Sequence, residues 1–166
     1  PFKQVEGTTI YRAPLLEEEE YKGRGERWCL SCERGPARNY FFYQPVEGNS
    51  RWLFEGHTNR ITEVHEWVEV PGQSPRKVIG FLYQTVRETP GEKGDKKSRQ
   101  RISLWGSRAD GKGRVLILHD AEDVLLISQE SSETVRIFFE KEGVYQVMTI
   151  TPDFAVVRTD VLPIGL

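Results

Sequence analysis

The feature that most constrains the fold of this chain is the spacing of its turns. From residue 39 onward, runs of β-branched and aromatic residues are broken by glycine, proline or short charged segments. The breaks come about every eight to twelve residues, a spacing typical of antiparallel all-β domains. No segment after residue 22 shows the apolar period of a long amphipathic helix. The sequence therefore predicts an all-β fold.

The predicted strands are short and bounded by turn residues. Segments 39–43 and 51–55 flank a turn with proline and glycine and form a hairpin candidate. Asp110-Gly111 marks a second hairpin, because this dipeptide suits the left-handed backbone of a tight turn. The other predicted strands are 61–70, 77–86, 101–107, 114–119, 124–129, 134–139, 144–150 and 154–162.

Two stretches resemble each other as four-stranded units. Residues 61–118 hold four of the predicted strands and residues 124–161 hold four more, while 39–55 corresponds to the last two strands of a preceding unit. Four-stranded antiparallel units repeated along a chain are typical of β-propeller blades. So few units do not close a ring, so the sequence predicts either a partial propeller or a two-layer β-sandwich.

Residues 1–37 differ in composition from the rest of the chain. Within them, segment 15–28 joins four consecutive glutamates to a mixed basic stretch with glycines. One or two helical turns at 15–21 are compatible with this pattern, but we expect residues 1–37 to form an extended N-terminal arm. Residues 38–166 are then predicted to form a single all-β domain.

The overall charge limits the class of partner. The chain of 166 residues has a formal net charge of −2, which supplies no general positive field for nucleic acid or an anionic membrane. The longest apolar runs, such as 78–83, are far shorter than a bilayer span. We therefore expect neither a nucleic-acid partner nor a transmembrane segment.

Several short motifs resemble those of a known family. A strand ending in Leu-Phe at 51–55 follows a glycine turn, a strand at 77–86 precedes an acidic loop, and Ser-Arg-Ala-Asp-Gly stands at 107–111. This arrangement resembles uncharacterised bacterial envelope-type proteins with repeats like the blades of TolB-like propellers. The resemblance covers residues 38–160. It implies a propeller-like fold and a location in the bacterial cell envelope, and it carries no established activity or cofactor.

The acidic loop departs from the pattern of that family, which is Asp-x-Asn-x-Asp-Gly, as in an EF-hand-type loop. The corresponding positions here are Glu88, Pro90, Glu92 and, in place of the glycine, Lys93. A lysine there brings positive charge beside the ion and removes the residue best suited to a left-handed turn. We therefore expect a degenerate loop that binds no calcium.

The chain has two cysteines, Cys29 and Cys32, in a Trp-Cys-x-x-Cys motif. A thioredoxin-type site needs a buried strand before this motif and a helix after it, and neither is predicted. A zinc site needs two further ligands, for which His57 and His65 are candidates. We expect structural thiols or a small local disulfide, and a thiol- or metal-dependent enzyme is the first alternative.

The histidines and one basic loop are the remaining chemical candidates. His57, His65 and His119 stand in no catalytic or metal-binding spacing, so we interpret them as surface or edge residues. Loop 93–101 is basic and precedes Trp105, a combination that suits phosphate or RNA. A nucleic-acid-binding module is therefore the second alternative, although lysines in such a loop also serve to protect a sheet edge.

The sequence favours a non-catalytic protein-binding or scaffold module that uses no cofactor. Its partner is expected to be another protein or a second copy of the chain. Trp52, Phe54 and Trp67 are the predicted anchors, because tryptophan is enriched among interface hot spots. The compartment stays open, and the bacterial envelope is the location that the resemblance implies.

Overall fold

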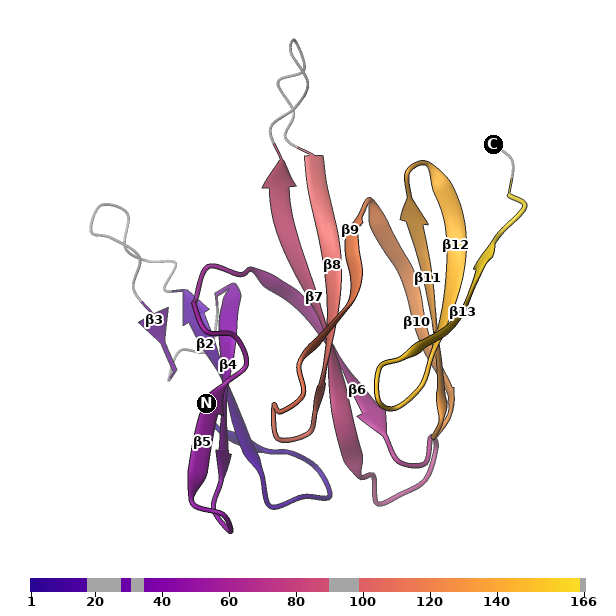
Figure 1. Ribbon diagram of the computed structural model, residues 1–166. Helices are drawn as coiled ribbons and strands as arrows, with labels where there is room; N and C mark the ends of the chain where they lie inside the picture. The colour runs from indigo at the N-terminus through magenta and orange to yellow at the C-terminus, as the bar shows by residue number, and fades with distance from the viewer. Residues whose placement is uncertain (18–27, 31–34, 90–98, 165–166) are drawn as a thin grey trace.

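A computed structural model describes residues 1–17, 28–30, 35–89 and 99–164 (Figure 1). All regular elements in these residues are β-strands, and every strand pairing among them is antiparallel. The strands form one sheet of nine and one of four. The predicted all-β class is therefore confirmed. None of the described segments is a helix that could cross a membrane.

The first strand group forms one end of the molecule. It consists of β1 (Lys3–Gln4), β2 (Tyr11–Glu17), β4 (Ala37–Gln44) and β5 (Asn49–Trp52), paired in that order, with β3 (Trp28–Cys29) added at the end of β2. Residues 3–4 and 11–17 thus form strands of the sheet, in a segment where an extended arm or a helical turn was expected. Ala13 and Leu15 are buried. The local pattern did not indicate β2 because the strand contains Pro14, and proline is usually found at sheet edges.

The second and third strand groups match the two predicted four-stranded units. The second is a meander of β6 (Ile61–Val68), β7 (Val78–Thr89), β8 (Arg99–Arg108) and β9 (Val115–Ala121). The third, a separate sheet, is a meander of β10 (Asp123–Ser131), β11 (Thr134–Lys141), β12 (Val144–Ile150) and β13 (Val156–Val161). The first and second groups are joined in one sheet by a single bridge, Ala37 opposite Ile61.

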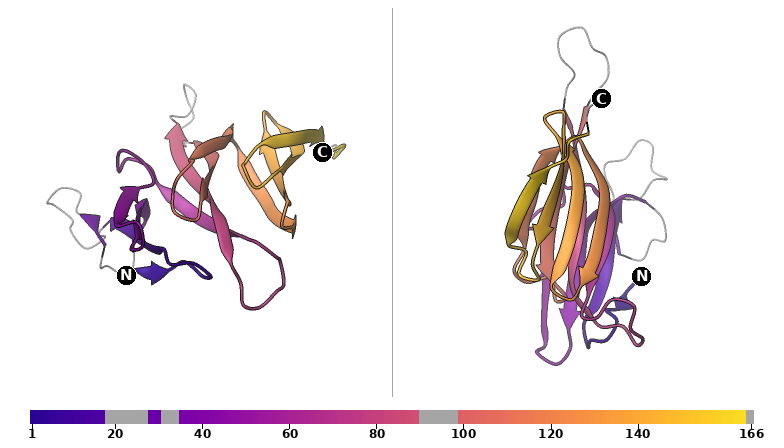
Figure 2. Two further views of the ribbon diagram at one scale, coloured as in Figure 1. Left: turned by 60° about the horizontal axis from the view of Figure 1, so that its bottom comes forward. Right: turned by 90° about the vertical axis from the view of Figure 1, so that its right-hand side faces the viewer.

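The three strand groups stand side by side (Figure 2). One apolar core lies between each pair of neighbouring groups. The first interface lies between the first and second groups, and the second interface lies between the second and third groups. Strand β7 supplies both, because alternate side chains of a strand point to opposite faces. Phe81 and Tyr83 enter the first interface and Leu82 enters the second. The packing of both faces explains why the segment 78–83 of β7 is almost continuously apolar.

Candidate functional site

The inner strand of the second group, β6, is paired along only part of one edge. Its other edge pairs with β7 throughout. On the partly open edge, Ala37 is bridged to Ile61 at one end. At the other end the Gln129 side-chain amide accepts a hydrogen bond from Val68 N at 3.1 Å and donates one to Val68 O at 2.6 Å. Between these points no described residue bonds the β6 backbone on this edge.

The open edge presents regularly spaced backbone groups. In an antiparallel strand, the N–H and C=O groups of successive residues alternate between the two edges. Val68 directs its groups toward Gln129, so Val64 and Glu66 direct theirs to the same side. The register shift near Val68 does not disturb this alternation, because the extra residue, Ile79, belongs to β7.

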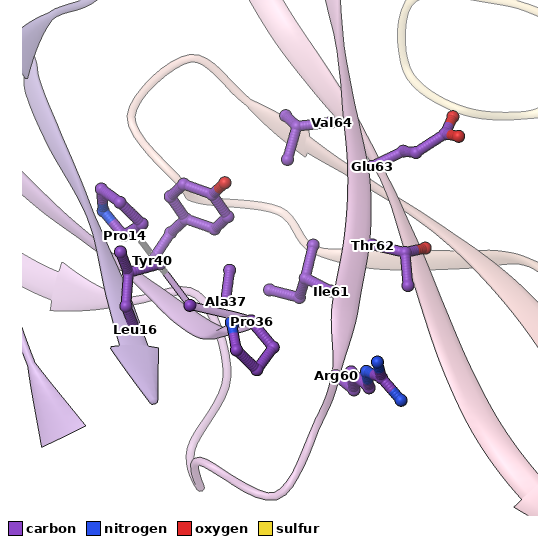
Figure 3. Close-up of a pocket in the computed structure, with 11 residues that line it drawn as sticks. Pro14, Leu16, Pro36, Ala37, Tyr40, Arg60, Ile61, Thr62, Glu63 and Val64 are labelled. Atoms are coloured by element: carbon purple, nitrogen blue, oxygen red, sulfur yellow. The ribbon is translucent and has the colours of Figure 1, made fainter. Parts of the chain in front are cut away.

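A hollow of about 600 Å³ lies beside the first half of this edge. Figure 3 shows residues from the first strand group on one side of the hollow and residues of β6 on the other. The apolar part of its lining consists of Pro14, Leu16, Pro36, Ala37, Ile61 and Val64, and Tyr40 adds an aromatic ring with a hydroxyl group. The hollow therefore combines apolar contact surface with a neighbouring row of unpaired backbone groups.

A second hollow of about 360 Å³ continues along the edge beyond Val64, which lines both. It is bounded by Arg12 of β2, by Glu66 of β6 and by Gln129 of the third strand group. We call the two hollows and the β6 edge between them the β6 groove. All three strand groups contribute to this groove, so it exists only in the assembled fold.

Arg12 is one of two cations of the β6 groove without an acidic partner among the described residues, the other being Arg60 in the first hollow. Its guanidinium carbon lies 4.1 Å from the ring centre of Phe81 and 4.8 Å from that of Tyr40. Its Nη1 atom is buried and has no hydrogen-bond partner. Arg76, by contrast, pairs with Glu66 at 2.7 Å. A buried charged donor is costly unless an acceptor satisfies it, and Arg12 is also among the residues that line the second hollow.

The tyrosines around Arg12 are held neutral. Burial raises the pKa of Tyr40, an effect that the nearby Arg12 charge partly offsets. Burial also raises the pKa of Tyr83 strongly, and its hydroxyl lies 3.1 Å from Ser107 Oγ. Neither hydroxyl is suited to exchange a proton at neutral pH.

The three predicted anchors lie in different environments. Trp52 is 36% exposed and packs against His57 at 4.8 Å between ring centres. Phe54 is 5% exposed and belongs to the first interface. Trp67 is 1% exposed, belongs to the second interface and donates a hydrogen bond to Ser132 O at 3.1 Å. Phe54 and Trp67 thus support the cores rather than a surface, and of the three only Trp52 reaches solvent.

The candidate metal and thiol residues are not brought together as one site. Cys29 is disulfide-bonded, and Cys32 lies outside the described residues. A disulfide sulfur is not a thiolate, which is the nucleophile and metal-binding form of cysteine. His57 accepts a hydrogen bond from Asn39 Nδ2 at 3.0 Å, whereas His65 lines the second hollow. Across the described ranges, no group of three or more metal-ligating residues forms.

His119 takes part in a cluster that sequence analysis did not find. Its Nδ1 lies 3.5 Å from Ser103 Oγ, and its Nε2 lies 3.3 Å from Asp120 Oδ2. The residue types are those of a hydrolase triad. However, the His119 side chain is 63% exposed, and Asp120 also pairs with Arg87. We interpret the cluster as a surface polar network, because nothing excludes water from its imidazole.

The predicted calcium-type loop and basic loop lie mostly beyond the described part of the chain. Glu88 is described near the end of β7, whereas Pro90, Glu92 and Lys93 lie outside the described residues, as does the rest of the loop through residue 98. The expected lack of calcium binding and the nucleic-acid alternative both depend on this loop. Both stay predictions from the sequence.

In comparisons with known proteins, no protein-family model, curated protein or solved structure matches this chain. The resemblance to envelope-type proteins with TolB-like repeats therefore stays a prediction from the short motifs. The function has to be argued from the β6 groove and its chemistry.

Proposed function

We propose that this chain is a non-catalytic protein-binding module and that the β6 groove is its binding surface. The observation that carries the proposal is the open stretch of β6 edge flanked by two hollows. Exposed strand edges are templates for pairing with another chain, and natural sheets usually cover or protect them. Here no described residue pairs with the edge between Ile61 and Val68, and apolar side chains lie beside it, as a recognition site for a protein segment requires.

The three strand groups also support the proposal of a propeller-like scaffold. Each of the three consists mainly of four antiparallel strands, and two cores separate neighbouring groups. In such an arrangement the inner strand edges face a shared axis, where propellers have their central channel. The position of the β6 groove, with residues from all three groups, is consistent with a binding site at that axis.

The two rival functions find less support in the described residues. A thiol- or metal-dependent enzyme would use Cys29, which is disulfide-bonded. A nucleic-acid module needs several unpaired cations to neutralise phosphates. In the β6 groove, Arg76 already pairs with Glu66 and Glu6, which leaves two cations, Arg12 and Arg60, without an ion pair among the described residues. A protein segment is therefore the better match to the groove.

The proposal is tested by selecting linear peptides on the folded protein from a random display library. Recovered peptides are then measured against Val64→Lys, which places a charged chain in the groove where both hollows meet. The matched control is Val157→Lys on β13, at a position 66% exposed. We expect Val64→Lys to reduce affinity about tenfold or more while the control binds like the wild type.

Both variants must show the thermal unfolding transition of a folded protein before binding is compared. If no peptide is recovered and the protein also fails to self-associate, the proposed function is wrong. Peptides that bind both variants equally would move the binding surface away from the β6 groove.

A further inference from the structure

We infer that the ligand of the β6 groove is an extended peptide segment that pairs with the open edge of β6 as an added strand and places a carboxylate at Arg12. The inference rests on the proposed function and names the chemical class of the partner. It follows from the hydrogen bonds that Gln129 makes with the β6 backbone at one end of the edge and from the charges along the groove.

The Gln129 side chain shows what kind of group this edge binds. Its primary amide both accepts from and donates to Val68, as the peptide groups of a neighbouring antiparallel strand would. An amide supplied from 61 residues away thus takes the place of a strand at the end of β6. Val64 and Glu66 offer the same pair of backbone groups with no described partner, so a peptide backbone is complementary to them.

The edge also limits the length of the added strand. Ala37 occupies it at Ile61, and Gln129 occupies it at Val68. The open stretch between them spans residues 62–67. An extended segment of about six residues, roughly 20 Å long, fills it at about 3.4 Å per residue. A peptide much longer than this has to leave the edge at both ends.

The side chains of the groove define what the added strand carries. Alternate side chains of a strand point to one face, and on one face of the edge lies the apolar hollow with Leu16 and Val64. We therefore expect apolar residues at every second position of the bound segment. This pattern distinguishes an added strand from a helical ligand, whose apolar residues recur at three and four positions.

The charges of the groove favour an acidic segment. Glu66 is neutralised by Arg76 at 2.7 Å, and in the first hollow Glu63 shares the lining with Arg60, which has no ion pair among the described residues. Arg12 has a buried Nη1 atom without an acceptor. A carboxylate at the guanidinium supplies that acceptor in a charge-assisted hydrogen bond. We thus expect an aspartate, a glutamate or a free C-terminus near one end of the bound segment.

The backbone part of the inference is tested with a peptide selected on the wild-type protein and synthesised as a series of single N-methyl derivatives. N-methylation removes one N–H donor at a time. If the peptide pairs with β6, derivatives at every second position lose about tenfold or more in affinity and those between them keep it. Hydrogen exchange should slow at the amides of Val64 and Glu66 in the complex.

The charge part is tested on both partners. Replacing the acidic residue of the peptide by its amide should weaken binding to the wild type about tenfold. It should have little further effect on Arg12→Gln, and Arg158→Gln on β13 is the matched control. Changing the peptide makes the test independent of whether Arg12→Gln folds well.

Each failure has its own meaning. Peptides that require Val64 but tolerate every N-methyl group would overturn the strand-pairing inference and leave the proposed function standing. Peptides that pair with β6 but bind equally well as amides would overturn the role of Arg12. Absence of both peptide binding and self-association would contradict the proposed function itself.

Discussion

The first interface packs aromatic rings around a cation, whereas the second packs mainly aliphatic side chains around Trp67 and Phe154. Arg12 stacks over Phe81 in the first. Dispersion and area burial explain most of the second interface. The first also has polar groups that must be oriented and hydrogen-bonded, such as the buried Asn39 side chain. Both interfaces border the β6 groove, since Trp67, Leu82 and Val135 of the second line its second hollow.

The hydrogen bonds of Asn39 show how buried polar groups of the first strand group find partners. This fully buried amide accepts from the backbone N–H groups of Tyr40 and Phe54 at 2.9 and 3.0 Å. It also donates to the carbonyl groups of Phe54 and Gly56 at 2.8 and 3.0 Å. The amide thus holds the chain after β5 in one conformation. Among the described residues, two buried side-chain atoms lack a hydrogen-bond partner, Arg12 Nη1 in this strand group and Glu122 Oε2 between β9 and β10.

The largest expected change in the free energy of unfolding comes from truncating Trp67 in the second interface. Trp67→Ala should lower the free energy of unfolding by about 3–5 kcal/mol, because it removes a buried ring that packs against Phe154 and leaves a cavity. Chemical denaturation measures the change. The matched control is Val70→Ala, which replaces an exposed residue just after β6. A loss of less than 1 kcal/mol for Trp67→Ala would show that this core is not the aliphatic, tightly packed one described.

Alkaline pH should act on the first interface. Burial raises the pKa of the Tyr83 hydroxyl well above the ordinary tyrosine pKa of about 10, so the unfolded chain loses this proton first. The protonated Tyr83 hydroxyl makes its full contribution to the free energy of unfolding below pH 10. This contribution is lost as the pH rises toward the pKa of Tyr83 in the folded protein, at up to about 1.4 kcal/mol per pH unit. Tyr83→Phe should flatten the fall in unfolding free energy above pH 10, measured by denaturation at several pH values. Equal slopes for both proteins would contradict the burial of this hydroxyl.

Gly106→Ala should overfill the second interface. A Cβ at this position would lie 2.4–2.7 Å from atoms of the Phe154 ring, so the ring must move. We expect a loss of about 1–3 kcal/mol, measured by thermal or chemical unfolding. Gly56→Ala, where no atom lies within 4 Å of the added Cβ, is the matched control. Combining Gly106→Ala with Phe154→Leu should recover part of the loss, and simple additivity of the two changes would argue against the contact.

The smallest effect on stability is expected at Arg12. Methionine keeps the contact with the rings of Phe81 and Tyr40 and removes a charge that has no acidic partner among the described residues. Arg12→Met should therefore change the free energy of unfolding by no more than about 1 kcal/mol in either direction. Arg158→Met, at an exposed site on β13, is the control. A loss above 2 kcal/mol would show that Arg12 has a structural partner and is not held for a ligand.

The strands and turns of the second and third groups followed from the sequence. The run predicted at 144–150 is β12 without change, and Gly111 has the positive φ of 79° expected for the turn after β8. Alternation of side chains and the φ preference of glycine are local properties. They can therefore be read without knowing which strands pair.

The burial of aromatic residues could not be predicted in the same way. Trp52 and Phe54 are two residues apart, yet one reaches solvent and the other is buried against Trp105. The sequence pattern places both on strand-like segments with similar neighbours. Which face is covered depends on the packing of β8 and on the path of the chain after β5, and both are set by contacts distant in sequence.

The sequence by itself determined the all-β class, the two four-stranded units and most strand positions, because these depend on residues close together in the chain. Only the tertiary structure decided that β6 has an open edge. That edge exists because β4 pairs with β5 after a single bridge at Ala37. Gln129 comes to β6 from 61 residues away, and Arg12 enters through a strand that the local pattern did not reveal. Such pairings depend on how whole strand groups pack, which no local preference of the chain specifies.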